Sequence, residues 1–202
     1  MVIGLIDYGM GNLRSVLNAL DRLGVAGRVV GEGDQLAGVD KALLPGVGAF
    51  GDGMRELRER GFTEALPAYV ADGRPLLGIC LGMQLLGTVS HEHGEHSGLD
   101  LIPGVVRQIE TDPTLRIPHV GWNELAVERP SRLLDGLDDP PMFYFVHSYE
   151  LKPDDPAALT GTTDYGRPLT ATVEHGTAYG VQFHPEKSQR CGLRVLENFL
   201  AL

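Results

Sequence analysis

Cys80 is the residue of this sequence best placed for nucleophilic chemistry. An apolar run that ends at Cys80 predicts a buried strand, and the apolar spacing after it predicts a helix to about Val89. Gly78 and Gly82 flank the cysteine at two residues on either side, where a sharp strand-to-helix turn leaves no room for a Cβ. Such a turn lifts the sulfur out of the sheet, and the helix N-terminus favours its thiolate. The pattern predicts a reactive cysteine, with a small buried side chain as the alternative.

A histidine and a glutamate near the C-terminus could supply the base that such a cysteine needs. His184 and Glu186 follow an apolar run over residues 178–183. Because side chains alternate along a strand, we expect both at its end on one side. The carboxylate would then hold the imidazole while the other ring nitrogen faces the thiol. Together with Cys80 they form a candidate triad for nucleophilic catalysis.

Two further positions could serve the same chemistry. Gly46 and Gly48 surround Val47 in a loop after an apolar run, and glycines there allow the backbone to turn its amides toward a ligand. An ordinary turn is the alternative for this loop. Gln84 follows Cys80 by one helical turn, so its amide could reach a substrate bound at the sulfur, unless it only lies on a solvated helix face.

Hydrophobic patterning predicts one α/β domain over residues 1–202, a length that leaves little room for more. Apolar runs predict strands of a parallel sheet at 2–6, 27–30 and 41–44, and apolar spacing predicts helices at 13–23, 54–60 and 62–71, the last interrupted at Pro67. Short runs at 105–109, 125–127, 142–146, 169–173 and 178–183 predict a partly antiparallel second half of the sheet, followed by a helix through 193–200. The predicted fold is a mostly parallel sheet flanked by helices, with a nucleophile elbow.

Composition and charge exclude several classes of function. A net charge of -10 without clustered Lys and Arg argues against a nucleic-acid partner. The apolar runs are too short to span a membrane, and Met1 leads directly into a predicted strand, so a soluble, cytoplasmic protein is expected. Cys80 and Cys191 are expected to be reduced thiols in that compartment, with Cys191 as a structural bystander.

Three other patterns resemble sites without meeting their requirements. Gly9 and Gly11 suggest a dinucleotide fingerprint, but Arg14 stands where its third glycine belongs, so no nucleotide cofactor is expected. Residues 90–98 contain three histidines and two glutamates in a polar, glycine-broken segment, which predicts a mobile loop rather than a metal site. Trp122 is expected on a loop, either at a contact surface or over the core.

Six stretches of the chain together resemble the triad-type glutamine amidotransferases. Three of them are the motifs described above, in the family's order, at 45–48, 78–84 and 183–186. Three more, at 7–14, 117–124 and 144–149, are similar to the glutaminase subunits of imidazole glycerol phosphate synthases in histidine biosynthesis, as is Lys187 directly after the glutamate. The resemblance covers the whole chain.

This resemblance implies a mechanism without a metal or other cofactor. Cys80 would attack the side-chain carboxamide of glutamine, His184 would protonate the departing ammonia and then activate water, and Glu186 would orient the imidazole. By the family pattern, the oxyanion of the tetrahedral intermediate would be bound by the amides of Leu81 and of Val47, in the loop that includes Gly48. The residues that would contact the substrate are Gly46, Gln84, Ser148 and Tyr149. That glycine-rich loop would also be the regulatory element.

The resemblance also implies a partner that consumes the ammonia. It would be a (β/α)8 barrel cyclase, bound as a heterodimer, that makes imidazole glycerol phosphate and an aminoimidazole carboxamide nucleotide. Asn12, Trp122, Tyr144 and Lys187 match positions that face this partner in the family, with local capping, packing or surface roles as the alternatives. Two other functions remain open: a glutaminase that serves another synthase, such as pyridoxal phosphate synthase, and an elbow-cysteine peptidase-like hydrolase.

Overall fold

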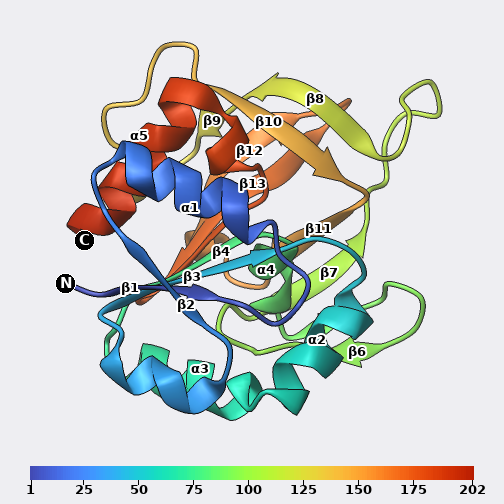
Figure 1. Ribbon diagram of the computed structural model, residues 1–202. Coiled ribbons are helices and arrows are strands. Elements are labelled where there is room, and N and C mark those ends of the chain that lie inside the picture. The colour runs from blue at the N-terminus through green and yellow to red at the C-terminus, as the bar shows by residue number, and fades with distance from the viewer.

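A large mixed sheet forms the centre of the computed structural model, which describes residues 1–202 (Figure 1). Its strands are β1 (Ile3–Ile6), β2 (Gly27–Val30), β3 (Lys41–Gly46), β4 (Leu76–Cys80), β9 (Ala126–Val127), β12 (Leu159–Asp164), β13 (Pro168–His175) and β14 (Ala178–Val181). They lie in the order β2-β1-β3-β4-β14-β13-β12-β9. The first five of these are parallel and the last three continue antiparallel, which confirms the predicted fold class.

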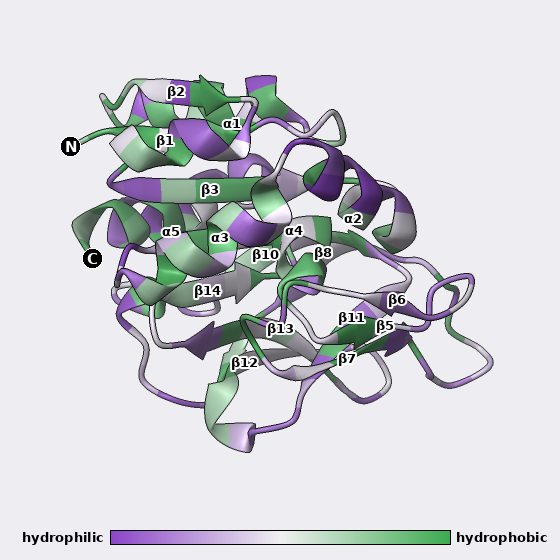
Figure 2. Ribbon diagram, turned by 90° about the horizontal axis from the view of Figure 1, so that it is seen from below, coloured by the Kyte–Doolittle hydropathy of each residue, from purple (hydrophilic) through white to green (hydrophobic).

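Helices cover both faces of this sheet. One face carries α1 (Leu13–Arg22) and α5 (Gln189–Ala201), and the other carries α2 (Phe50–Glu59), α3 (Phe62–Ala71) and α4 (Leu81–Leu85). Side chains alternate along the strand β3, so both faces of the sheet are apolar. Leu43 packs on the face of α1 and α5, whereas Ala42 and Leu44 pack on the face of α2, α3 and α4. Figure 2 shows β3 as hydrophobic over most of its length and the helices as mixed. None of the helices is both long and apolar enough to cross a bilayer.

Two small sheets lie beside the carboxyl ends of the parallel strands. One pairs β8 (His119–Glu124) with β10 (Met142–His147), and the other has the order β11-β7-β5-β6, formed by β5 (Val89–Ser90), β6 (His96–Ser97), β7 (Gly104–Gln108) and β11 (Tyr149–Pro153). Four 3-10 turns complete the fold: η1 (Gly33–Gly38), η2 (Arg132–Leu134), η3 (Pro156–Ala158) and η4 (Pro185–Lys187). The junction of β10 and β11 brings residues 147–149 to the end of β4.

Several helix boundaries differ from the prediction. The helix α2 begins at Phe50 rather than 54, and α3 continues through Pro67, because its buried face outweighs the one hydrogen bond that proline removes. The helix after Cys80 ends at Leu85 instead of Val89. The amide of Leu99 donates to the Leu85 carbonyl, so a returning segment satisfies the helix end and covers it.

Two segments predicted as loops contain strands. Trp122 lies in β8, where it is directly opposite Tyr144 of β10. The polar segment 90–98 is part of a hairpin in which His96 pairs with Ser90, and β5 continues onto β7. Backbone pairing holds this segment although its side chains are polar. The strands β11 and β12 were not predicted at all.

Candidate active site

Cys80 lies at the sharp corner between β4 and α4. Its φ is 56°, in the left-handed region that few residues other than glycine adopt. Such backbone strain costs on the order of 1–3 kcal/mol and is concentrated at functional sites. The corner depends on close packing: a Cβ at Gly82 would lie 1.7 Å from the carbonyl oxygen of Leu44, and one at Gly78 would lie 2.5 Å from that of Gly82.

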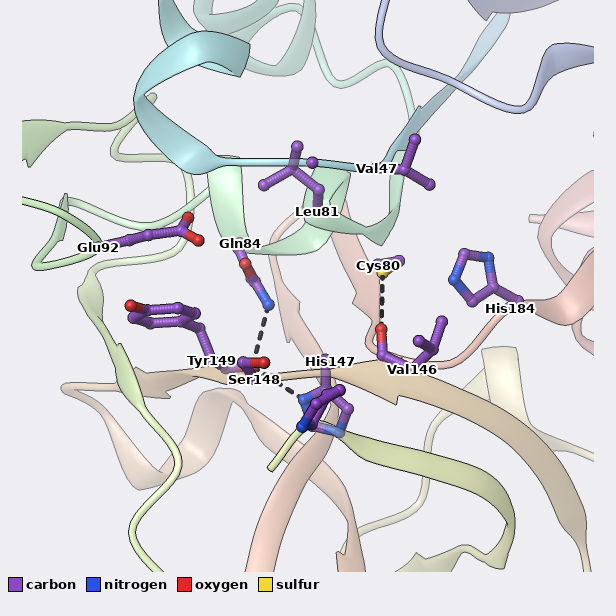
Figure 3. A pocket seen from close by; sticks show the side chains of 12 residues that line it. Val47, Cys80, Leu81, Gln84, Glu92, Val146, His147, Ser148, Tyr149 and His184 are labelled. Carbon is purple, nitrogen blue, oxygen red and sulfur yellow. Dashed lines mark hydrogen bonds between the residues drawn. The ribbon is translucent and has the colours of Figure 1, made fainter. Parts of the chain in front are cut away.

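His184 and Glu186 lie beside this corner, but strand alternation does not place them there. The strand β14 ends at Val181, and Pro185, which has no N–H, begins the 3-10 turn η4. This turn sets His184 Nδ1 2.8 Å from Glu186 Oε1, with both side chains at most 3% exposed. His184 Nε2 has no hydrogen-bond partner, and the ring shares a pocket wall with the Cys80 sulfur (Figure 3).

The electrostatics of the site favour a protonated imidazole next to the sulfur. Burial by itself lowers the pKa of His184, but interactions with Cys80 and Glu186 outweigh it and raise the pKa to about 9. An imidazolium of this kind is a common neighbour of thiolate nucleophiles. The buried amide of Gln182 adds a donor, with its Nε2 3.8 Å from Cys80 Sγ. The arrangement can therefore present a nucleophile, an acid and a carboxylate that orients the acid.

The sulfur opens into a pocket of about 400 Å³. Its walls come from the glycine-rich loop after β3, from the start of α4, from the β5–β6 hairpin and from the β10–β11 junction. The lining residues are Val47, Gly48, Cys80, Leu81, Gln84, Glu92, Pro118, Val146, His147, Ser148, Tyr149 and His184. Eight of these twelve are residues that the sequence assigned to the site, so segments far apart in the chain meet at one cavity.

The glycine-rich loop lies directly beside the corner, since Gly46 pairs with Cys80 in the sheet. Leu81 is the first residue of α4, so its amide has no acceptor within the helix. The amide of Val47 instead donates to the carbonyl oxygen of Met10 at 2.7 Å, rather than toward the pocket. Of the two amides expected to face an oxyanion, only that of Leu81 is free to do so in this arrangement. Gly48 has a φ of 102°, which glycine adopts without strain.

Polar groups on the far wall of the pocket are held by one another. Gln84 Nε2 donates to the carbonyl oxygen of Tyr149 and to Gln182 Oε1, each at 3.0 Å. Glu92 is the only carboxylate in the lining, and its Oε2 accepts the amide of Phe50, the first residue of α2, at 2.6 Å. These contacts give the pocket one acidic group and one oriented side-chain amide, that of Gln84, which suits a ligand with an amine and a polar group that binds an amide.

Glu92 and His147 are the pocket residues of most chemical interest that sequence reasoning missed. Glu92 belongs to the polar segment that was predicted to be a mobile loop, and only the β5–β6 hairpin brings it to the wall. His147 lies inside one of the six resembling stretches, directly before Ser148, but a single histidine in an apolar strand carries no signal of its own. Pro118 and Val146 also line the cavity without having been predicted.

Three predicted residues lie behind the pocket instead of in its wall. Gly46, Glu186 and Asn12 line a narrow space on the other side of His184. Asn12 is exposed, and its Oδ1 accepts the amide of Ser15 at 3.4 Å as the N-cap of α1. Asn12 therefore has its expected local role and also lies close to the candidate triad.

The other three predicted contact residues form one aromatic and basic cluster on the surface, which we call the Trp122 cluster. Trp122 is 47% exposed and its ring meets that of Tyr144 edge to face, with centroids 6.1 Å apart. Lys187 is exposed, and its Nζ lies 5.9 Å from the centre of the Tyr144 ring. Because Lys187 follows Glu186 directly, this cluster lies next to the back of the candidate triad.

Comparison with known proteins agrees with the fold. The family model of glutamine amidotransferase class-I matches residues 4–202. A solved structure described as a glutamine amidotransferase aligns over 100% of this chain and 98% of its own, with a TM-score of 0.76 at 23% identity. The structure of PurLQS from Thermotoga maritima aligns with a TM-score of 0.77 at 20% identity, covering 98% and 97%. The fold and the site thus define a class-I glutamine amidotransferase.

More similar relatives narrow this class. The imidazole glycerol phosphate synthase subunit HisH of Desulfitobacterium hafniense is 50% identical over 198 residues, which cover 98% of this chain and 93% of that protein. The subunit of the same name from Aquifex aeolicus is 46% identical over 195 residues, covering 96% and 93%. The chain belongs to the HisH family, the glutamine amidotransferases of histidine biosynthesis. This result favours the main prediction over a glutaminase of another synthase and over a peptidase-like hydrolase.

Proposed function

We propose that Cys80, His184 and Glu186 hydrolyse glutamine to glutamate and ammonia, within one glutaminase domain that spans residues 1–202. The observation that carries this proposal is the meeting of a strained cysteine, a glutamate-held imidazole and an amide-lined pocket at one point. The pocket volume of about 400 Å³ is in the range of small-molecule sites.

The mechanism uses each member of the triad in turn. The Cys80 thiolate forms a bond to the carboxamide carbon, and the electron pair of its carbonyl moves to the oxygen. When that carbonyl re-forms, the C–N bond breaks, and the His184 imidazolium gives its proton to the departing nitrogen, which leaves as ammonia. The neutral imidazole then takes a proton from water, whose oxygen attacks the γ-glutamyl thioester and releases glutamate. Glu186 holds the ring and stabilises its charged form.

Substrate contacts follow from the charges of the pocket wall. The carboxylate of Glu92 suits the α-ammonium group of glutamine, while Gln84, Ser148 and Tyr149 lie where they can bind its other polar groups. Gly46 contributes by leaving room beside Cys80, since a Cβ there would lie 2.9 Å from that of Leu81. Binding of this kind fixes the carboxamide at the sulfur.

The oxyanion is held by the amides of Leu81 and Val47, and the second of these must first turn. In the present arrangement the Val47 amide is occupied by Met10. Gly46 and Gly48 on either side allow the peptide to rotate at little steric cost. Because one oxyanion donor is worth about 3 kcal/mol of barrier, this rotation would switch activity on. Met10 and Asn12 share one loop, so a partner that contacts Asn12 could release the Val47 amide.

The partner is a (β/α)8 barrel cyclase that binds at the Trp122 cluster and receives the ammonia as a heterodimer. Support comes from the HisH relatives, which are named as subunits of a synthase, and from the exposed aromatic and basic residues beside the triad. Trp and Tyr side chains are enriched in binding hot spots. The two free cysteines are consistent with the reducing cytoplasm, where this pathway would operate.

A mixing experiment tests the whole proposal. Glutamate release is measured for the chain alone, with a cyclase subunit, and with the cyclase and its nucleotide substrate. We expect slow turnover alone and strong activation in the complete mixture. Full activity of the isolated chain would contradict the partner-dependent rotation of Val47, and no glutamate release under any condition would contradict the glutaminase itself.

The Trp122 cluster has a test of its own. Replacing Trp122 by alanine should weaken binding of the cyclase by roughly 10- to 100-fold. Val29→Ala is the matched control, since Val29 is 46% exposed on the strand β2. Equal affinities of the two variants would place the partner elsewhere.

A further inference from the structure

Two buried histidines behind the pocket wall belong to one continuous series of hydrogen bonds. His147 Nδ1 lies 2.8 Å from the carbonyl oxygen of Tyr149, and His147 Nε2 lies 3.0 Å from Nδ1 of His119. His119 Nε2 in turn lies 3.3 Å from Nδ2 of Asn123. We call Asn123, His119, His147 and the Tyr149 carbonyl the histidine network. It runs from β8 through β10 to the pocket, where His147 is part of the wall (Figure 3).

Every donor in the histidine network points in the same direction. A carbonyl oxygen only accepts, so His147 carries its proton on Nδ1 and its Nε2 is an acceptor. His119 must then donate from Nδ1 and accept at Nε2 from the amide of Asn123. The Oδ1 of Asn123 accepts the amide of Glu124 at 2.9 Å, which fixes the orientation of that side chain. Both imidazoles are neutral, in agreement with burial, which lowers each pKa to about 4.

The network continues on the other side of Tyr149 to the nucleophile. The same carbonyl accepts one Nε2 hydrogen of Gln84, and the other goes to Gln182 Oε1. This contact fixes which end of the Gln182 amide faces Gln84, and it leaves Gln182 Nε2 directed at Cys80 Sγ. The Tyr149 carbonyl therefore accepts from both His147 and Gln84, and through Gln84 it sets how the Gln182 amide is oriented beside the sulfur.

We propose that His147, with His119 behind it, is a positioning residue for glutamine hydrolysis: it holds the Tyr149 carbonyl and thereby the orientation of Gln84. The inference rests on the proposed function. Without the His147 donor, the Tyr149 carbonyl keeps only the hydrogen bond from Gln84, and the Gln84 amide would move with that carbonyl. The fold would survive this loss, because the network contributes few of the contacts of the core, but the substrate-binding wall would lose its fixed geometry.

A matched pair of variants separates positioning from packing, measured in the complex with the cyclase. His147→Asn places an amide nitrogen near the position of Nδ1 and keeps the donor to Tyr149. His147→Gln places its amide near Nε2 and keeps the contact with His119, but it loses that donor. We expect the KM for glutamine to rise roughly tenfold in the Gln variant and to stay within about threefold in the Asn variant, with kcat little changed in both.

A third variant tests the outer histidine. His119→Phe keeps a ring beside Phe145 and Tyr165 but removes the donor to His147. Its KM should rise by about threefold, less than in the Gln variant, because it acts one step further from the pocket. Tyr165→Phe is the control: its ring lies 4.2 Å from that of His119, while its hydroxyl donates outside the network, to Arg116. The KM of this control should not change.

Failure of the positioning role of His147 can be distinguished from failure of the proposed glutamine hydrolysis. Equal KM values in the Asn and Gln variants, or a loss of kcat that follows melting temperature in both, would overturn the positioning role. Synthesis from added ammonia by the complex should be unchanged in every variant, since it bypasses the glutamine pocket. If the unmodified complex releases no glutamate from glutamine, the proposed function fails, whatever the histidine variants do.

Discussion

The parallel half of the main sheet and the small sheets beside it position the groups of the candidate active site by different physical means. In the parallel half, β3, β4 and α4 fix Cys80 by backbone packing, with a positive φ and glycines where no Cβ fits. In the small sheets and the segment after β14, hydrogen bonds from buried polar side chains hold the His184 ring and the backbone carbonyl of Tyr149. Steric positioning tolerates almost no added atom, whereas a polar network tolerates substitution as long as donors and acceptors still match.

The largest expected effect is loss of the nucleophile. Cys80→Ala removes the sulfur but keeps a Cβ at the strained corner, so the fold and partner binding should persist. Glutamine hydrolysis in the complex should fall by a factor on the order of 10⁴ or more, as when other triads lose a member. Glutamate release is the measurement, and ammonia-dependent synthesis by the same sample is the control. Retained glutamine hydrolysis in this variant would contradict a mechanism in which Cys80 is the nucleophile.

Glu186→Gln tests the polar side of the comparison. The amide keeps the size of the side chain but no longer stabilises the imidazolium of His184. We expect glutamine-dependent kcat to fall by roughly a thousandfold, with only a small change in melting temperature. The buried glutamate would be structural only if stability fell sharply while kcat of the folded fraction stayed normal.

Gly82→Ala tests the steric side. The new Cβ would lie 1.7 Å from the Leu44 carbonyl, so the elbow must move away from β3. Unfolding in urea should show a loss of about 3 kcal/mol or more. Gly31→Ala is the matched control, because nothing lies within 4 Å of its Cβ position and no positive φ is involved. If both variants were equally stable, close packing would not be what fixes the corner.

The smallest effect is a pH dependence of stability. Since the pKa of His184 is raised from 6.5 to about 9, the folded protein binds this proton more tightly than the unfolded chain. The resulting stability is fully present below about pH 6.5 and is lost as the pH rises through about 9. Glu186→Gln removes one of the groups that raise this pKa, so its urea midpoint should fall less steeply over that interval. If the urea midpoint of the variant fell more steeply with rising pH, Glu186 would not be a group that raises the pKa of His184.

The difference between steric and polar positioning also explains which parts of the site could be predicted from the sequence. Steric positioning leaves a mark in the sequence, because glycines at 78 and 82 and a continuous apolar strand are needed for the corner, and both were recognised. The direction of a peptide leaves no such mark, so the bond from Val47 to Met10 could not be foreseen. The site residues Glu92 and His147 were missed because their roles depend on which strands become neighbours.

The missed strands have related physical causes. The strand β8 exposes Val120 and Trp122, so its apolar residues do not mark a buried face, and Trp122 was assigned to a loop. The strand β12 buries threonines, and the hydroxyls of Thr160 and Thr172 bond each other at 2.8 Å. Hydrogen-bonded threonines fill a buried sheet without an apolar run. Hydrophobic patterning finds strands that are held by apolar contacts and misses those that are not.

The bond between the Val47 amide and the Met10 carbonyl has a consequence for inhibition. If the amides of Leu81 and Val47 hold the oxyanion as proposed, a compound that mimics the tetrahedral intermediate needs both donors, yet in the present arrangement the Val47 amide is occupied. Its onset should be time-dependent, because a peptide must rotate before the tight complex forms. Molecules that contact only the pocket wall of Gln84, Ser148 and Tyr149 would bind without that delay. The delay would therefore show whether the Val47 peptide has to rotate.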